Sequence, residues 1–172
     1  DFPRNFIPEP IAKKYKPFLT RIPGGLIKEP IDYWNYGIQS LNLPGPSFDA
    51  VTQVDYPGNQ RAFRASLPKQ QLFDKTMTVT MQAFDGYVNY WMAVEMFDFY
   101  YKLSGKHPYL PEGVGVQMLD ADGTVFVTVQ LKDMFISEVG ALDLNFSSNT
   151  IEFQTFDITF GYNILDVVVN VV

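Results

Sequence analysis

The residues that could carry out chemistry are few and stand apart from one another. The single histidine, His107, lies in "GKHPY" without a serine elbow or a carboxylate at motif spacing, so we expect a loop residue and not a catalytic base. Gly24 and Gly25 in "IPGGL" have no helical pattern after them, which predicts a turn and not a phosphate cradle. HExxH is absent, and so is any Cys/His metal set, because the chain has no cysteine.

Three further groups could act only if the fold assembled them. "DADG" at 120–123 lacks the later acidic ligands of a calcium loop and is flanked by strand patterns, so it predicts a hairpin turn. The 19 acidic residues could pair as in glycosidases, but their spread gives no specific pair. Trp91, Tyr100 and Tyr101 could form a ligand platform, although aromatic helices in small β domains are more often core. We therefore expect no enzyme, no cofactor and no metal.

Composition restricts the class of protein. The 172 residues are 47% hydrophobic and 16% aromatic, which predicts one folded domain with a substantial core. No apolar run reaches the roughly 20 residues of a membrane span, and we expect no membrane partner. The net charge is −6, from 13 basic and 19 acidic residues, and it disfavours nucleic-acid binding by charge neutralisation.

The elements must be placed before any surface can be judged. Residues 1–31 carry six of the twelve prolines together with many large apolar residues, which predicts an extended arm over its own domain or a neighbour; a free tail is the alternative. A period of three to four residues predicts a helix over 86–103, buried on most of its circumference. Strands and hairpins are expected at 31–44, 48–67, 76–83, 113–131, 134–146 and 151–162.

About seven strands and one helix predict a mainly β fold, an antiparallel β-sandwich or partly closed barrel with one packed α-helix. The strand at 151–162 shifts its apolar face near Gln154 and Thr155, through a bulge or a change of pairing partner. This strand, the arm, the hairpin at 48–67 and "DVVVNVV" offer more pairing edge than a monomer covers. Such an excess suits a protein that polymerises through heterologous interfaces.

The segment "GALDLNFSSNTIEFQTFDITFGYN" (140–163) resembles the C-terminal part of the tail tube proteins of contractile-tailed bacteriophages, with "FQTFDIT" in the place of the family's strand. "IQSLNLPG" is similar to the strand before the family's extended loop. "FDKTMTVTMQAFDGYVNYWMAVEMF" is similar to its strand-then-helix unit. Together these segments cover about two-thirds of the chain.

The resemblance implies a structural virion protein whose hexameric rings stack into the inner tail tube that conducts the genome during ejection. The partners implied are further copies of the chain, the tail sheath, the baseplate and the tail terminator, with transient passage of DNA. The location implied is the virion tail, after assembly in the host cytoplasm. The implied organisation is an N-terminal arm at 1–31, a tail-tube β domain at 32–163 and a C-terminal extension at 164–172. The arm and the extension either clamp subunits together or mark a protein that caps or initiates the tube.

Three alternatives stay open: a tube-initiator or baseplate ring, a secretion-system tube protein, and a small β-barrel that holds an apolar ligand. Arg61 and Arg64 are the candidate inter-ring contacts, because they lie in a long hairpin with an exposed turn in an acidic protein. Two solvated loop arginines are the competing interpretation.

Overall fold

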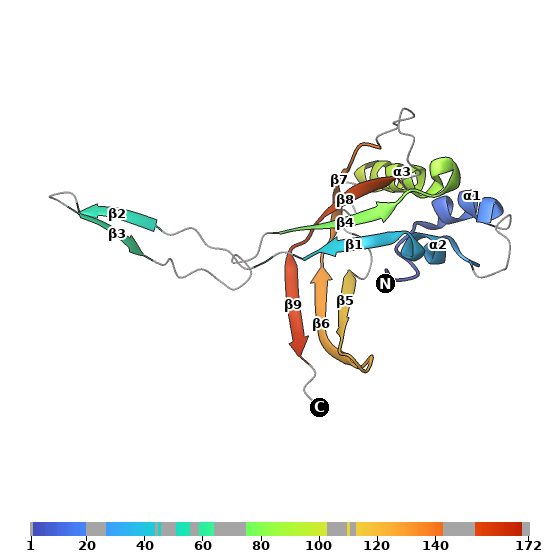
Figure 1. Ribbon diagram of the computed structural model, residues 1–172. Coiled ribbons are helices and arrows are strands. Elements are labelled where there is room, and N and C mark those ends of the chain that lie inside the picture. The colour runs from blue at the N-terminus through green and yellow to red at the C-terminus, as the bar shows by residue number, and fades with distance from the viewer. Residues whose placement is uncertain are drawn as a thin grey trace, which may run out of the picture.

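The computed structural model describes residues 2–19, 27–43, 45, 51–55, 59–63, 75–102, 110, 113–142 and 154–169. For 51–55, 59–63 and Asp85 it describes the backbone only. Within these ranges the chain forms nine strands, three α-helices and one 3-10 turn, against the seven strands and one helix expected. Figure 1 shows a body of helices and strands from which two further groups of strands project.

The body is built on a four-stranded antiparallel sheet. The strand order is β1 (Ile38–Asn42), β4 (Thr76–Gln82), β8 (Thr155–Gly161) and β7 (Phe135–Val139). The predicted alternation in β4 and β8 is confirmed, because every second residue is buried on one shared face and the register sets these residues opposite one another. The buried residues of the two strands are Met77, Val79, Met81, Phe156, Ile158 and Phe160.

The opposite face of this sheet is mostly polar, and one of its threonines hydrogen-bonds across the strands. The Thr80 hydroxyl donates to Asp157 Oδ1 at 2.7 Å. The shift of apolar face expected near Gln154 and Thr155 can be followed only from Gln154 onward, since 151–153 lie outside the described residues. From Thr155 to Gly161 the β8 register against β4 runs without interruption.

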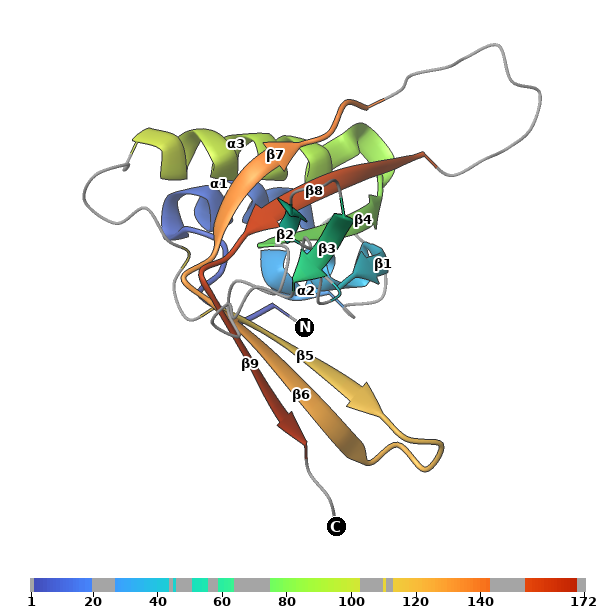
Figure 2. The same ribbon diagram turned by 90° about the vertical axis from the view of Figure 1, so that its left-hand side faces the viewer.

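Helices cover the apolar face of the sheet (Figures 1 and 2). The predicted helix at 86–103 is confirmed as α3 (Val88–Lys102), entered through a 3-10 turn at Asp85–Tyr87. Buried Asn89 joins α3 to β4, because its amide donates to the Gln82 carbonyl and accepts from the Phe84 N–H. The expectation that α3 is buried around most of its circumference is wrong: Trp91, Phe97 and Tyr101 are exposed.

The extended conformation predicted for residues 1–31 is also wrong, because α1 (Glu9–Leu19) lies inside this segment. Pro10 occupies the first turn, where the missing N–H has no helical partner to lose. Ile11 and Leu19 are buried. Lys14 pairs with Glu95 of α3. Packing of one apolar side therefore outweighs the low helix propensity of the prolines.

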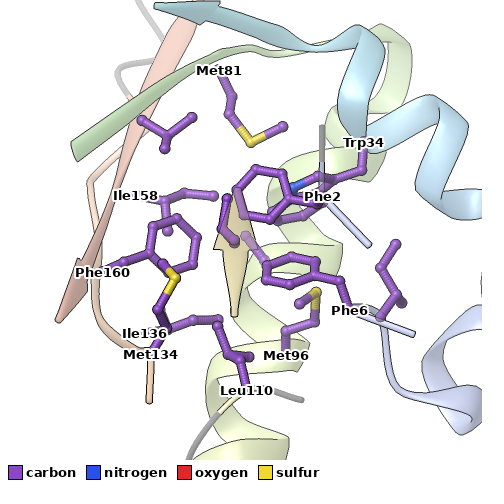
Figure 3. Close-up of a cluster of buried hydrophobic side chains, with 14 of the residues drawn as sticks. Phe2, Phe6, Trp34, Met81, Met96, Leu110, Met134, Ile136, Ile158 and Phe160 are labelled. Carbon is purple, nitrogen blue, oxygen red and sulfur yellow. The ribbon is translucent and has the colours of Figure 1, made fainter. Parts of the chain in front are cut away.

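Residues 2–8, which we call the N-terminal segment, form part of the core of their own chain. Phe2 and Phe6 are buried with ring centroids 4.3 Å apart, and Phe6 lies 6.1 Å from Phe160 of β8. Figure 3 shows both rings pointing into the cluster that contains Trp34 and Met96. The segment is thus an integral layer of the body.

The first core strand expected at 31–44 is shorter than predicted, since its beginning is helical. Helix α2 (Pro30–Tyr36) precedes β1. Pro30 opens the helix, and the Asp32 carboxylate accepts from the N–H of Glu29 at 3.1 Å and of Lys28 at 3.3 Å. This local capping overrides the β propensity of the aromatic residues that follow. The predicted boundary between 31 and 32 therefore falls within a helix.

A second antiparallel sheet projects from the body, with the order β5 (Val114–Leu119), β6 (Val125–Lys132) and β9 (Ile164–Val169). The predicted turn at "DADG" is confirmed between β5 and β6. Residues 164–169 pair along β6, so they are a strand of this sheet and not an extension beyond the domain. Their apolar character was visible in the sequence, but only the register shows which strand they join.

The predicted hairpin at 48–67 is confirmed as β2 (Val51–Asp55) and β3 (Asn59–Phe63), paired from Val51↔Phe63 to Asp55↔Asn59. Figure 1 shows this hairpin standing away from the other strands. The mainly β class with a packed main helix is confirmed, and the two larger sheets are antiparallel and do not close. No helix within the described ranges has both the length and the hydropathy to cross a membrane.

Candidate functional site

One face of the projecting sheet is apolar in every row. The register of β5, β6 and β9 aligns their side chains in three cross-strand rows of three, and in an antiparallel sheet such rows share one face. We call these nine residues the apolar sheet face. From the body outward, its rows are Val114–Leu131–Leu165, Val116–Val129–Val167 and Met118–Val127–Val169.

Burial falls steadily along the apolar sheet face. In the row nearest the body, Val114, Leu131 and Leu165 are all buried. In the outermost row, Met118 and Val169 are both exposed by about half. Figures 1 and 2 show the sheet leaving the body, with the β5–β6 turn at its free end. The core of the chain is therefore continuous with an apolar surface that its own described residues leave open to solvent.

The other face of the same sheet is mostly polar. Gln117 and Gln130 are exposed there, and Lys132 Nζ lies 3.0 Å from Asp166 Oδ2. A sheet with one polar and one apolar face normally packs its apolar face on protein and leaves the other in water. This arrangement therefore indicates a protein partner for the apolar sheet face.

The two outer strands of this sheet, β5 and β9, have no second strand beside them among the described residues. β5 and β9 each pair with β6 on one side, so their outer N–H and C=O groups are available to a further strand. Near its free end β5 carries a register shift at Met118 and Leu119, a feature that blunts pairing locally. β9 runs in register along β6 from Ile164 to Val169, and it offers the more regular edge.

Gly113 makes the entry into this sheet possible. Its φ is +54°, and a Cβ atom there would lie 2.2 Å from the Leu131 carbonyl oxygen. Any other residue would clash with the backbone of β6. A Cβ atom added at Gly115, two residues later, would have no other atom within 4 Å. The requirement for glycine is therefore specific to position 113.

A second exposed apolar surface lies on α3. Phe97 and Tyr101 stack with ring planes 10° apart and centroids 6.5 Å apart. Trp91 meets Tyr90 edge-on at 5.5 Å. The expectation that Trp91 and Tyr101 belong to the core is therefore wrong. The reason is that α3 buries the side with Met92 and Met96, and the aromatic side faces outward.

Two tyrosines near the N-terminal segment have raised pKa values. Burial is the larger cause that raises the pKa of Tyr15 to about 12, and a hydrogen bond from its hydroxyl to Glu95 at 2.9 Å adds to it. Burial raises the pKa of Tyr100 to about 12 as well, and its hydroxyl donates to the Phe6 carbonyl at 3.3 Å. Both phenols are neutral at physiological pH, and they tie α1 and the N-terminal segment to α3.

The residues expected to form a site are only partly placed. Arg61 lies on β3 opposite Gln53, and its side chain is not among those described. Arg64, His107, Gly24 and Gly25 lie outside the described residues. No group of three metal-binding side chains occurs in the described part of the chain.

The apolar sheet face itself was not predicted. Its signal was present as two runs that largely alternate in period two, at 114–118 and 125–131, and one short, mostly apolar run at 165–169. The sequence does not show that these runs share one sheet and one face, because β9 is separated from β6 by more than thirty residues.

Comparison with known proteins gives matches in structure alone. No protein-family model and no curated protein matches the chain. A chain of the anti-feeding prophage cap, described as a tube-terminating cap, is 14% identical with a TM-score of 0.50, over 77% of this chain and 80% of that one. A chain of the six-fold symmetrised anti-feeding prophage baseplate is 10% identical with a TM-score of 0.50, over 76% and 80%. These two matches confirm a tail-tube-type fold.

Proposed function

We propose that this chain is a structural subunit that self-associates into hexameric rings, and that the rings stack into the inner tube of a contractile, phage-tail-like assembly. The observation that carries the proposal is the apolar sheet face, which continues the core of the monomer into open solvent. The chain is similar in fold to chains of the cap and of the baseplate of the anti-feeding prophage, and the baseplate structure is six-fold symmetrised. The role is mechanical and needs no active site.

In the proposed ring, the apolar sheet face packs against the body of the adjacent copy. The free edges of β5 and β9 from neighbouring copies then lie near each other, which allows the sheets to join around the ring. Burial of the outer row removes about half of each of Met118 and Val169 from water. Interfaces with apolar centres of this kind are typical of permanent assemblies.

The polar face of the sheet then lines the channel. Six copies at −6 each carry −36 in total, and a wall rich in glutamine with few cations has little attraction for nucleic acid. Such a channel fits a conduit through which a genome passes without sticking. Sheath, baseplate and tail terminator proteins are the partners that this role requires, and the tail of a virion or of a similar particle is its location.

A single ring at one end of a tube is the second candidate function, favoured because two of the neighbours in fold are chains of a tube-terminating cap and of a baseplate. The two roles differ in how many rings stack. A cap or initiator forms one ring or a pair, whereas a tube subunit forms stacks of indefinite length.

Sedimentation velocity and negative-stain electron microscopy of the purified chain test the proposal. Raising the concentration, or adding ammonium sulfate to strengthen apolar burial, should convert monomers into rings with six-fold top views. Long hollow tubes identify the tube subunit, and isolated rings identify the cap or initiator. A chain that stays strictly monomeric at high concentration and in strong salt would refute self-assembly.

A further inference from the structure

A small cleft lies between the N-terminal segment, α1 and α2. Its volume is about 180 Å³, below the roughly 300–1,000 Å³ of most small-molecule sites. It therefore has room for a few side chains of another protein and not for a cofactor. Its lining residues are Arg4, Ile7, Ala12, Lys13, Lys16, Glu29, Pro30 and Ile31. We call it the basic cleft.

The basic cleft has an apolar floor and a positive rim. Ile7 and Ile31 are buried. Three cations, Arg4, Lys13 and Lys16, line the cleft with one carboxylate, Glu29. Lys13 is paired with Glu9 at 2.7 Å, and Arg4 and Lys16 are exposed with no ion pair to a described residue. In a chain with a net charge of −6, this local excess of cations favours an occupant that has both carboxylates and apolar side chains.

The turn between β5 and β6 presents that combination. Leu119 is 60% exposed and Phe126 is 51% exposed, and Asp120 and Asp122 are exposed between them. We call residues 119–126 the β5–β6 tip. Exposed apolar groups beside two carboxylates complement an apolar floor beside two free cations.

The β5–β6 tip is ordered before it meets any partner. Asp120 Oδ1 accepts from the N–H of Asp122 and of Thr124, both at 2.9 Å. Gly123 closes the turn with a φ of +81°, and its N–H donates to the Asp120 carbonyl at 3.1 Å. Because the backbone is already fixed, binding would lose little conformational entropy. The Asp122 carboxylate makes no such bond to a described residue, and its side chain is exposed.

The β5–β6 tip and the basic cleft of one chain are at different ends of the molecule. In Figures 1 and 2 the tip is at the free end of the projecting sheet, and α1 and α2 lie on the body. The tip therefore reaches the cleft of another copy and not its own. Two different surfaces that meet in this way form a heterologous interface, which builds rings or stacks.

We infer that the basic cleft receives the β5–β6 tip of a second copy. The Asp122 carboxylate lies between Arg4 and Lys16, and an apolar side chain of the tip covers the floor formed by Ile7 and Ile31. This inference rests on the proposed self-assembly and identifies two surfaces that take part in it.

Charge reversal tests the contact with the full-length chain. The first variant, Arg4→Glu with Lys16→Glu, makes the cleft acidic. The second, Asp120→Asn with Asp122→Lys, makes the tip basic, and the asparagine keeps the oxygen that accepts the turn hydrogen bonds. Each variant alone sets like charges against each other and should raise the concentration needed for assembly about tenfold or more. Lys75→Glu, at an exposed lysine on another part of the body, is the control and should assemble as the unmodified chain does.

Mixing the two variants gives the decisive result. In an equimolar mixture, the acidic cleft meets the basic tip, and the basic cleft of the other variant meets the acidic tip. The mixture should therefore assemble at about the same concentration as the unmodified chain, with the two variants alternating in the assembly. Its assembly should weaken as the salt concentration increases. A folding defect would not be rescued by mixing.

The possible failures can be told apart. If the unmodified chain never assembles, the proposed function fails. If the unmodified chain assembles and both variants assemble equally well, or if mixing gives no rescue, the contact between tip and cleft is refuted while the proposed function stands.

Discussion

Val169 gives the sharpest test of the apolar sheet face. It lies in the outermost row and is 52% exposed, whereas its neighbour Val168, on the opposite face, is 47% exposed. Val169→Asp and Val168→Asp therefore make the same chemical change in the same strand, at nearly the same exposure. They differ only in the face that receives the charge.

The expected magnitude follows from burial. Full burial of a valine side chain contributes about 1.5–3 kcal/mol, so the exposed half of Val169 contributes about 1 kcal/mol to each interface. An unpaired carboxylate buried in its place adds a desolvation cost of several kcal/mol. The sum is about 3 kcal/mol or more per interface, which weakens association roughly a hundredfold at about 1.4 kcal/mol per tenfold.

Sedimentation velocity over a concentration series measures this shift for both variants. Circular dichroism melts first establish that each monomer folds, which we expect because both side chains are already half in water. Val168→Asp should assemble within about threefold of the unmodified chain, since an exposed substitution changes little. If the two variants assemble alike, the apolar sheet face is not the interface and the proposal loses the observation that carries it.

Three further changes test the fold that supports this surface. Phe6→Ala removes a fully buried ring and should lower the free energy of unfolding by about 3–5 kcal/mol; a change below 1 kcal/mol in a urea titration would show that the N-terminal segment is not part of the core. Gly113 has a φ of +54°, and an added Cβ would lie 2.2 Å from the Leu131 carbonyl oxygen. Gly113→Ala should therefore lower the free energy of unfolding by about 2 kcal/mol or more. Gly115→Ala, whose Cβ would have no atom within 4 Å, should show no such loss in the same thermal melt. Burial raises the pKa of Tyr100 to about 12 from 10.0, so the folded chain holds that proton more tightly than the unfolded chain does. Its contribution to stability is complete below pH 10 and declines between pH 10 and 12; Tyr100→Phe should make the decline shallower in denaturation curves over that range, and an identical pH dependence would contradict the assignment.

Local chemistry in the sequence was sufficient for several elements. Alternation in period two predicted β4 and β8, because side chains of a strand point to opposite faces whatever lies around them. Asp120 and Gly123 predicted the β5–β6 turn. The Asp120 carboxylate accepts hydrogen bonds within four residues, and Gly123 adopts the positive φ that the turn needs. The change of period at residue 86 predicted α3, although it did not show which side of the helix would be buried.

Tertiary structure decided what depends on distant partners. Packing on α3 made 9–19 a helix, against the proline content of that segment. The aromatic side of α3 stays in solvent because Met92 and Met96 fill the space over the sheet.

The candidate site depends on the same distinction. Each run of β5, β6 and β9 is amphipathic or apolar when read alone, and any of them could have packed inside a monomer. Register sets Met118, Val127 and Val169 in one row at the exposed end of a projecting sheet. The sequence alone determined that these residues favour burial. Only the tertiary structure decided that the described part of their own chain leaves them uncovered, because the apolar face of the main sheet is already filled by helices and the N-terminal segment.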